Sequence, residues 1–209
     1  MKKTLSMAIL AVLLTVSMGF LAKKPKWVSL FDGKTLNGWK VGENASSFKV
    51  EDGAIVVNGP VGHLFYDGKV GNHDFKNFEF KAQVMTTPGS NSGLYFHTEY
   101  QEKSWPSKGF EVQVNNSHTD WKRTASLSNI QDIKKTFVAD NVWYTETIIV
   151  QGKRIITKIN DKVVVDYTEP DNIDKSKGRK LSSGTFAIQA HDPKSKVYVK
   201  DIMVKILPD

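Results

Sequence analysis

The chain of 209 residues contains no cysteine. It therefore has no disulfide framework, no thiolate metal site, no thiol nucleophile and no residue that could carry a lipoprotein anchor. Proline is scarce, with 7 residues, and no proline-rich linker divides the chain. The length favours a single domain, which at this size buries about 70% of its unfolded surface without metal or disulfide support.

Long hydrophobic runs are absent apart from one at the N-terminus. Two lysines precede an apolar run from Met7 to Ala22, a pattern that predicts a secretory signal peptide over residues 1–22. Cleavage near Ser17 or at Ala22 fits this pattern, and the alternative is a retained membrane anchor. A signal peptide implies a periplasmic or extracellular protein with no stable membrane span after processing.

The charge is only moderately biased, with 29 Lys+Arg against 22 Asp+Glu. The excess lysines are spread out, apart from short clusters near Lys23–Lys26 and Lys175–Lys180. Nucleic-acid binding would need a basic stripe with interleaved aromatic residues, and none is present. No glycine-rich phosphate loop and no Gly-x-Ser-x-Gly motif occurs, so we expect no nucleic-acid partner and no nucleotide cofactor.

Alternation of apolar and polar residues predicts an all-β protein. This period of two is typical of half-buried strands, and glycine and asparagine turns separate the segments. A two-sheet antiparallel sandwich over residues 25–208 is the simplest arrangement. In the last strand we expect Tyr198, Lys200 and Ile202 to share a face. The predicted strands are 75–86, 110–115, 143–150, 154–159, 162–167, 185–191 and 198–206, and 171–184 is a predicted loop.

Polar side chains follow one face of three predicted strands. Such rows can orient a polyhydroxylated ligand or bind a metal. An ordinary solvated face would more often carry Lys, Thr and Glu, but a sheet face exposed to water is the alternative. Glu111, on a predicted central strand between apolar neighbours, is the best candidate for a general base. The three rows are Glu111, Gln113 and Asn115; Gln189 and His191; and Tyr95, His97 and Glu99.

The five histidines show no metal-binding spacing along the sequence. A divalent metal site assembled across strands from His97, Glu111, His118 and His191 remains open. His63 and His73 lie in a glycine-rich region and are expected to be loop residues.

Two tryptophans lie in loop-like segments that bracket the Glu111 strand. If Trp105 and Trp121 are exposed beside a polar groove, their rings would stack on a sugar ring. The alternative is that both side chains fold back and pack inside the loops.

Several segments together resemble one family. The opening segment 27–39, Trp-Val-Ser-Leu-Phe-Asp-Gly-Lys-Thr-Leu-Asn-Gly-Trp, is similar to the start of the 3-keto-disaccharide hydrolase domain, also catalogued as domain of unknown function 1080. The order of the later segments agrees with that family over nearly the whole chain. These later segments are Asn91–Phe96, Gly109–Val114, Thr124–Leu127, Trp143–Asp166 and Gly184–Leu207.

The resemblance implies a concanavalin A-like, laminin G-like jelly roll that binds carbohydrate. It also implies cleavage of 3-keto-glycosides, by hydrolysis or by elimination and hydration, with a divalent cation or hydrogen-bond donors at the enolate. Glu111, Gln113, Gln189 and His191 match polar positions of the family. Asn115 and His97 depart from it, since many members have an acidic residue and an arginine there.

Two functions follow as hypotheses. The first is an enzyme with Glu111, His191 and His97 as catalytic residues. Its substrate-binding residues would be Gln113, Gln189, Tyr95, Trp105, Trp121 and Asn115. The second is a non-catalytic, lectin-like module on the same fold. The oligomeric state is not predicted.

Overall fold

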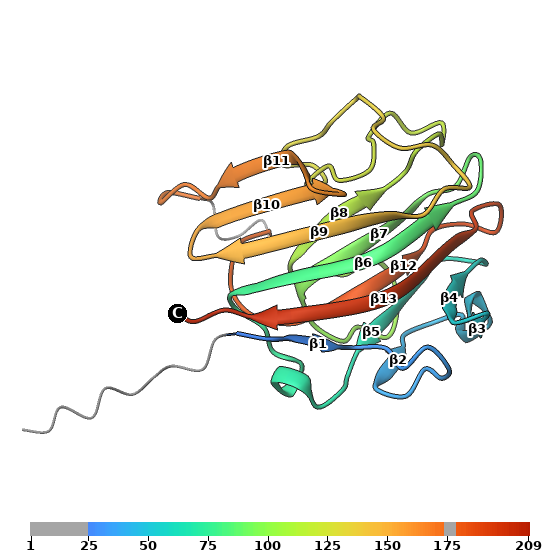
Figure 1. Ribbon diagram of the computed structural model, residues 1–209, viewed down its shortest axis with the longest axis horizontal. Helices are drawn as coiled ribbons and strands as arrows, with labels where there is room; N and C mark the ends of the chain where they lie inside the picture. Colours follow the sequence, from blue (N-terminus) through green and yellow to red (C-terminus); the bar gives the residue numbers. More distant parts are fainter. Residues whose placement is uncertain (1–24, 174–178) are drawn as a thin grey trace, which may run out of the picture.

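A computed structural model describes residues 25–173 and 179–209 (Figure 1). The predicted signal peptide and part of the Lys175–Lys180 cluster lie outside the described residues. No helix in the described ranges is long and apolar enough to cross a membrane.

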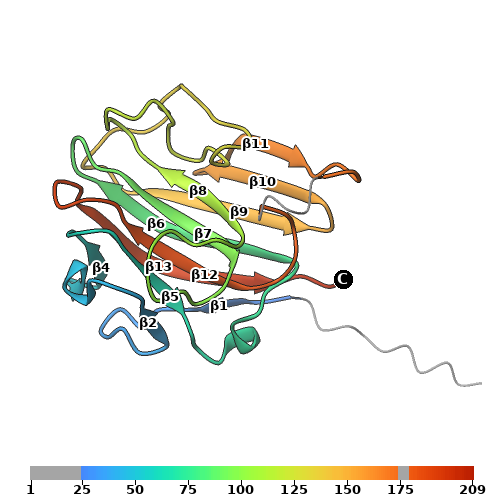
Figure 2. The same ribbon diagram turned by 180° about the vertical axis from the view of Figure 1, so that it is seen from behind.

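Two antiparallel sheets pack face to face, as the alternation pattern predicts. The larger sheet has the order β11-β10-β9-β6-β13-β4-β3, with β1 beside β13, and the smaller sheet has the order β2-β5-β12-β7-β8. Figure 1 shows the larger sheet in front, and Figure 2 shows the smaller sheet from the opposite side. The larger sheet contains β1 (Trp27–Ser29), β3 (Phe48–Glu51), β4 (Ala54–Val57), β6 (Phe78–Thr86), β9 (Tyr144–Gln151), β10 (Arg154–Ile159), β11 (Lys162–Thr168) and β13 (Val197–Ile206). The smaller sheet contains β2 (Trp39–Val41), β5 (Gly62–Tyr66), β7 (Ser92–Thr98), β8 (Phe110–Val114) and β12 (Thr185–Ala190), and two short 3-10 helices, η1 (Ala45–Ser47) and η2 (Val70–His73), lie in connections.

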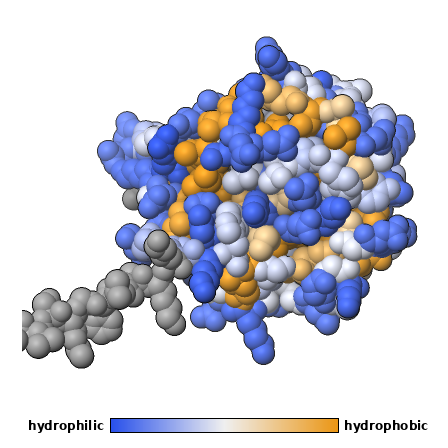
Figure 3. Space-filling view, in the orientation of Figure 1, coloured by the Kyte–Doolittle hydropathy of each residue, from blue (hydrophilic) through white to orange (hydrophobic). Residues whose placement is uncertain are grey.

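The two sheets differ in how their outer faces meet solvent. β6 alternates between buried and half-buried residues, and hydrophilic residues cover much of the larger sheet's outer face (Figure 3). Every residue of β5, β7, β8 and β12 is buried, including their polar ones. The outer face of the smaller sheet is therefore covered by loops, and its polar rows are not an ordinary solvated surface.

Two details of the predicted strands are wrong. β8 is the last strand of its sheet, and not a central one, although the segment 124–128 covers its free edge with hydrogen bonds. In β13 the register shifts between Lys200 and Met203, where Asp201 has φ +48°. This bulge places both Val199 and Ile202 in the core, so strict alternation fails there.

Glu146 occupies a core-facing position of β9 and is fully buried. Neither carboxyl oxygen has a hydrogen-bond partner among the described residues, and burial raises the pKa of Glu146 well above its ordinary value of 4.5. Because the folded state keeps this proton to higher pH than the unfolded chain, the contribution of Glu146 to stability is fully present below pH 4.5 and falls as the pH rises.

In the wild type, ionisation of Glu146 lowers the free energy of unfolding by up to about 1.4 kcal/mol for each pH unit above 4.5. We therefore predict that Glu146→Gln, which cannot ionise, lacks this decrease. The difference between the melting temperature of the variant and that of the wild type should increase, in favour of the variant, as the pH is raised from 4.5. Thermal unfolding followed by circular dichroism across the pH range measures this gain. Parallel melting curves for the two proteins would contradict the prediction.

Candidate active site

Three polar side chains from three neighbouring strands meet on the outer face of the smaller sheet. The side-chain amide nitrogen of Gln189, on β12, donates hydrogen bonds to the Glu111 carboxylate at 2.8 Å and to the Tyr95 hydroxyl at 2.9 Å. Glu111 lies on β8 and Tyr95 on β7, directly opposite each other in the register. One amide therefore fixes the position of a buried carboxylate and a phenol.

Gly93 provides the space in which the Glu111 carboxylate lies. A Cβ atom at position 93 would fall 2.5 Å from Glu111 Oε1 and 2.9 Å from its Cγ. The Glu111 side chain thus leans across the bare backbone of β7 to reach Gln189. Any side chain at position 93 would compete with the carboxylate for this space.

Burial raises the pKa of Glu111 above its ordinary value of 4.5. The Gln189 hydrogen bond and the positive charge of Arg179 stabilise the ionised carboxylate, so they lower the pKa of Glu111 and offset part of the effect of burial. Arg179 is itself held by a hydrogen bond to the Ser128 carbonyl at 3.1 Å. Glu111 is therefore a carboxyl group whose pKa is shifted toward neutrality, as proton transfer near neutral pH requires.

A pocket of about 300 Å³ opens above these groups. Gln113 lies on its wall, where its amide nitrogen donates to Asn91 Oδ1 at 2.6 Å. Trp105 is 44% exposed and lines the pocket from the loop between β7 and β8. The lining residues are Asn91, Tyr95, Trp105, Pro106, Glu111, Gln113, Asp120, Lys122, Ser128, Asn129, Arg179, Gln189 and His191.

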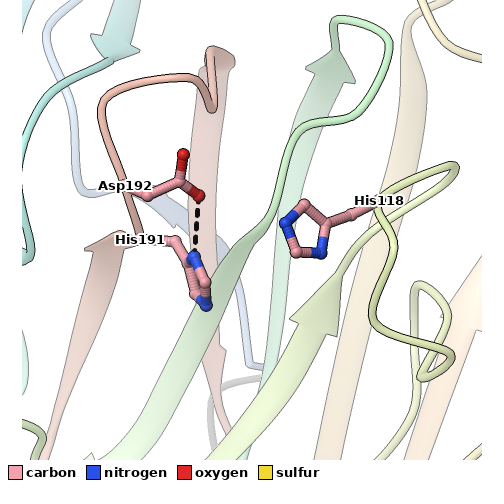
Figure 4. A group of neighbouring side chains, drawn as sticks. All are labelled: His118, His191 and Asp192. Atoms are coloured by element: carbon pink, nitrogen blue, oxygen red, sulfur yellow. Dashed lines mark hydrogen bonds and ion pairs between the residues drawn. The ribbon is translucent and has the colours of Figure 1, made fainter.

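His191 follows β12 at the rim of this pocket and is oriented by its neighbour (Figure 4). His191 Nδ1 donates to Asp192 Oδ2 at 2.8 Å. Partial burial alone would raise the pKa of Asp192, but hydrogen bonds from the Ser195 hydroxyl, from His191 and from the Lys194 amide lower it to about 2. The ionised Asp192 thus holds a proton on Nδ1, so Nε2 is the nitrogen that carries the lone pair in the neutral ring.

His118 approaches His191 from another loop, with ring centroids 5.6 Å apart. Each of His118, His191 and Asp192 offers a ligand atom within 4.8 Å of the others, so this group could hold a metal ion. The structure thus brings together two of the four predicted metal ligands, His118 and His191, and adds Asp192.

The prediction that His97 shares a face with Tyr95 is wrong. His97 has φ +53°, so the strand bulges and its ring turns to the other side, against Phe78 and Phe96. Its Nε2 contacts the Lys76 carbonyl at 2.9 Å, and burial lowers its pKa to about 4. His97 is a buried structural residue and lies outside the pocket.

Two other predicted ligand-binding residues also lie outside the pocket lining. Asn115 is fully buried, and its amide nitrogen holds the following loop through the carbonyls of Asp120 and Lys122. Trp121 is 48% exposed, with the Lys134 ammonium 5.4 Å from its ring centre. Glu99, the last member of the third polar row, lines a different pocket.

His63 lies in β5 and not in a loop, contrary to the prediction. It is paired with Gln189 in the register and is 2% exposed. Its ring lies edge-on to Tyr95 at 5.3 Å and to Trp105 at 5.5 Å. Burial lowers the pKa of His63 to about 4, so its ring is neutral at pH 7. His73 is the last residue of the short 3-10 helix η2, which lies in the connection between β5 and β6.

Two residues of the pocket, Asn91 and Arg179, and Asp192 beside it were not predicted from the sequence. Asn91 precedes a strand, and Arg179 falls in a predicted loop, so neither carries a periodic signal. Asp192 could have been found, because it directly follows His191 and begins an Asp-Pro-Lys-Ser turn.

Comparison with known proteins gives one family. The sequence model of a family described as the 3-keto-alpha-glucoside-1,2-lyase-like domain matches residues 26–205. A protein of Bacteroides thetaiotaomicron named 3-keto-disaccharide hydrolase is 29% identical over 170 residues, which is 68% of this chain. The match covers 58% of that relative, so the chain spans less than two thirds of its length.

Solved structures share the fold. A candidate glycosyl hydrolase from Parabacteroides distasonis ATCC 8503 has a TM-score of 0.73 at 21% identity, covering 87% of this chain and 94% of the other. The carbohydrate-binding module CBM66 from Bacillus subtilis has a TM-score of 0.59 at 12% identity, covering 80% and 95%. A Bacillus licheniformis β-glucanase has a TM-score of 0.58 at 8% identity, covering 88% and 99%. The two-sheet jelly-roll prediction is confirmed.

Proposed function

Because the chain belongs to the 3-keto-alpha-glucoside-1,2-lyase-like domain family, we propose that it is an enzyme that cleaves 3-keto-glycosides by elimination followed by hydration. One observation carries this proposal: a buried carboxylate with a raised pKa is fixed by an amide at the base of a polar pocket. The name of the Bacteroides relative supports the substrate class.

The chemistry begins at the carbon beside the ketone. A ketone at C3 acidifies the proton on C2, and the Glu111 carboxylate is the base that removes it. The C1–O bond then breaks, a C1=C2 double bond forms, and the departing oxygen takes a proton from water in the open pocket. The hydroxide left by that step adds to C1, and Glu111 returns its proton to C2. The sum is one water consumed and one glycosidic bond cleaved.

The remaining pocket residues fit a sugar that becomes negatively charged. Arg179 and Lys122 supply positive charge toward the enolate oxygen that develops at C3. Trp105 offers an exposed ring on which the apolar face of the sugar stacks. The Gln189 side-chain oxygen is buried and has no hydrogen-bond partner among the described residues, so it is placed to accept from a sugar hydroxyl.

Of the three residues that could hold a metal ion at the rim, His191 is the best placed ligand. In the neutral ring of His191 the lone pair is on Nε2, and Asp192 orients the ring as carboxylates orient metal-bound histidines. All the hydrogen bonds of Asp192, to His191, Lys194 and Ser195, suit an orienting role and not a ligating one. His118 could join His191 as a ligand only by giving up the hydrogen bond that its Nδ1 accepts from the Asp120 amide at 3.0 Å. An ion held by the two rings would polarise the ketone oxygen.

We predict that Asp192→Asn lowers kcat/KM by about 10- to 100-fold, because the introduced amide would face the His191 N–H and reverse the tautomer of the ring. Steady-state kinetics of aglycone release measures the effect, with Asp161→Asn, in an exposed turn, as the matched control. Unchanged kinetics in Asp192→Asn at an unchanged melting temperature would remove His191 orientation from the mechanism.

We also propose that the protein works in the periplasm or outside the cell, on the basis of the N-terminal pattern over residues 1–22.

The proposal is tested by aglycone release. Purified protein is incubated with p-nitrophenyl 3-keto-glucoside and with the unoxidised glucoside, each with and without chelator and added divalent ions. We expect release from the 3-keto-glucoside alone. Binding of either sugar without release under any metal condition would instead establish the lectin-like alternative.

A further inference from the structure

The outer face of the smaller sheet carries a second pocket that the proposed reaction does not use. The loop 99–109 crosses this face: Tyr100 packs on Phe65 with ring centroids 5.5 Å apart, and the Ser104 amide donates to Glu43 at 2.7 Å. The pocket beyond the loop has a volume of about 380 Å³ and shares no lining residue with the candidate active site. The two lie at opposite ends of β12, since Thr185 lines one and Gln189 the other. Three residues of strand lie between Thr185 and Gln189, so the two positions are four residue steps, or about 13 Å, apart.

The base of the second pocket contains a polar group that lacks a partner. Thr98 is 1% exposed and lines the pocket, and its hydroxyl has no hydrogen-bond partner among the described residues. The neighbouring Thr185 hydroxyl is already engaged, because it donates to the Tyr66 carbonyl at 2.5 Å. A buried hydroxyl without a partner is costly, and a ligand hydroxyl would satisfy it.

The walls offer hydrogen bonds in both directions, because Lys108 donates and the carboxylates of Asp67, Asp74 and Glu99 accept. Lys108 lies 3.4 Å from Glu99, and His73 lies 3.9 Å from Asp67. Tyr100 is 41% exposed beside these groups, and the Lys40 ammonium lies 3.7 Å from its ring centre. An aromatic ring together with these donors and acceptors is complementary to a sugar ring, whose hydroxyls donate and accept and whose C–H face stacks. Because the carboxylates outnumber the lysine, a neutral sugar fits better than an acidic one.

We propose that this second pocket binds a neutral sugar unit of an oligosaccharide, separately from the pocket of Glu111. The sugar belongs either to the chain of the substrate or to a separate glycan, and both present the same hydroxyl chemistry. The first source depends on the proposed function, and binding itself does not.

The test is a two-dimensional ¹H–¹⁵N NMR titration of the full chain. Maltotetraose, cellotetraose, laminaritetraose and xylotetraose are the probes. We expect at least one of them to shift the amide signals of Thr98, Tyr100 and Lys108. Tyr100→Ala should weaken that binding at least about tenfold, and Thr98→Val should weaken it as well.

Two control variants distinguish binding at the second pocket from binding at the Glu111 pocket. Trp121→Ala removes another exposed aromatic ring, and Glu111→Gln alters only the first pocket; both should bind the oligosaccharide as the wild type does. The inference is overturned if no probe shifts these amides, if only the Glu111 pocket responds, or if Tyr100→Ala binds unchanged.

Kinetics separates the two sources of the sugar. If the sugar belongs to the substrate, KM for a 3-keto-tetrasaccharide should be lower than for the 3-keto-disaccharide, and Tyr100→Ala should erase the difference. Equal KM values with persistent binding identify a separate glycan. Failure of the proposed function would appear differently, as no aglycone release while oligosaccharide binding persists.

Discussion

Glu111→Gln should lower the rate of aglycone release from a 3-keto-glucoside by about 100- to 10,000-fold, the usual contribution of a positioned general base. The amide has nearly the shape of the carboxylate but cannot accept the C2 proton. The fold should be retained, because Gln189 already hydrogen-bonds this group and the Gln189 amide can turn over. Steady-state and single-turnover rates measure the loss, and Glu51→Gln, on the outside of β3, is the control.

The pH dependence of the wild type follows from the same residue. Burial raises the pKa of Glu111, and the base must be ionised, so activity should be lost as the pH falls through a value above 4.5. An acid limb at or below pH 4.5, or near-normal activity of Glu111→Gln, would remove Glu111 from the role of base.

Gly93→Ala should cost about 100-fold or more in activity, approaching the loss in Glu111→Gln. The added methyl group would lie 2.5 Å from Glu111 Oε1, so the carboxylate must leave its place beside Gln189. The displaced group is the end of a flexible side chain, so the melting temperature should fall only slightly. Rates of aglycone release together with thermal unfolding separate these two effects.

A double variant shows whether both changes act through the same carboxylate. Gly93→Ala should cause no further loss when added to Glu111→Gln, because its effect passes entirely through that group. Additive losses would show that Gly93 serves another purpose, and full activity of Gly93→Ala would disprove the close approach.

The strands were predictable from the sequence where one face is apolar and the backbone is regular. β6, β9 and β10 alternate without interruption, and the β9–β10 turn contains Gly152 at φ +57°. Both properties are local, so periodicity and turn residues are enough to identify them.

The β-bulges were not predictable from the sequence, and they account for the largest errors in assigning side chains to a face of a strand. His97 and Asp201 both have positive φ, yet neither is glycine or asparagine. One such residue reverses the face of every side chain that follows it. The sequence therefore placed His97 beside Tyr95, and assigned Val199 to the wrong face of β13.

The active site was only partly predictable for a related reason. Glu111, Gln189 and Tyr95 are on one face by alternation alone, but a solvated face would show the same pattern. Burial of that face depends on the loop that carries Trp105 across the sheet, and loop paths are set by tertiary contacts. The contacts of His118 and Arg179 are likewise between segments distant in sequence.

The most direct test of the account is the rate of aglycone release from a 3-keto-glucoside that carries deuterium at C2. Under single-turnover conditions the bond to C2 breaks in the step assigned to Glu111, so we predict slower release from the deuterated substrate than from the protiated one. Equal rates from the two substrates would contradict removal of the C2 proton and favour direct hydrolysis of the glycosidic bond.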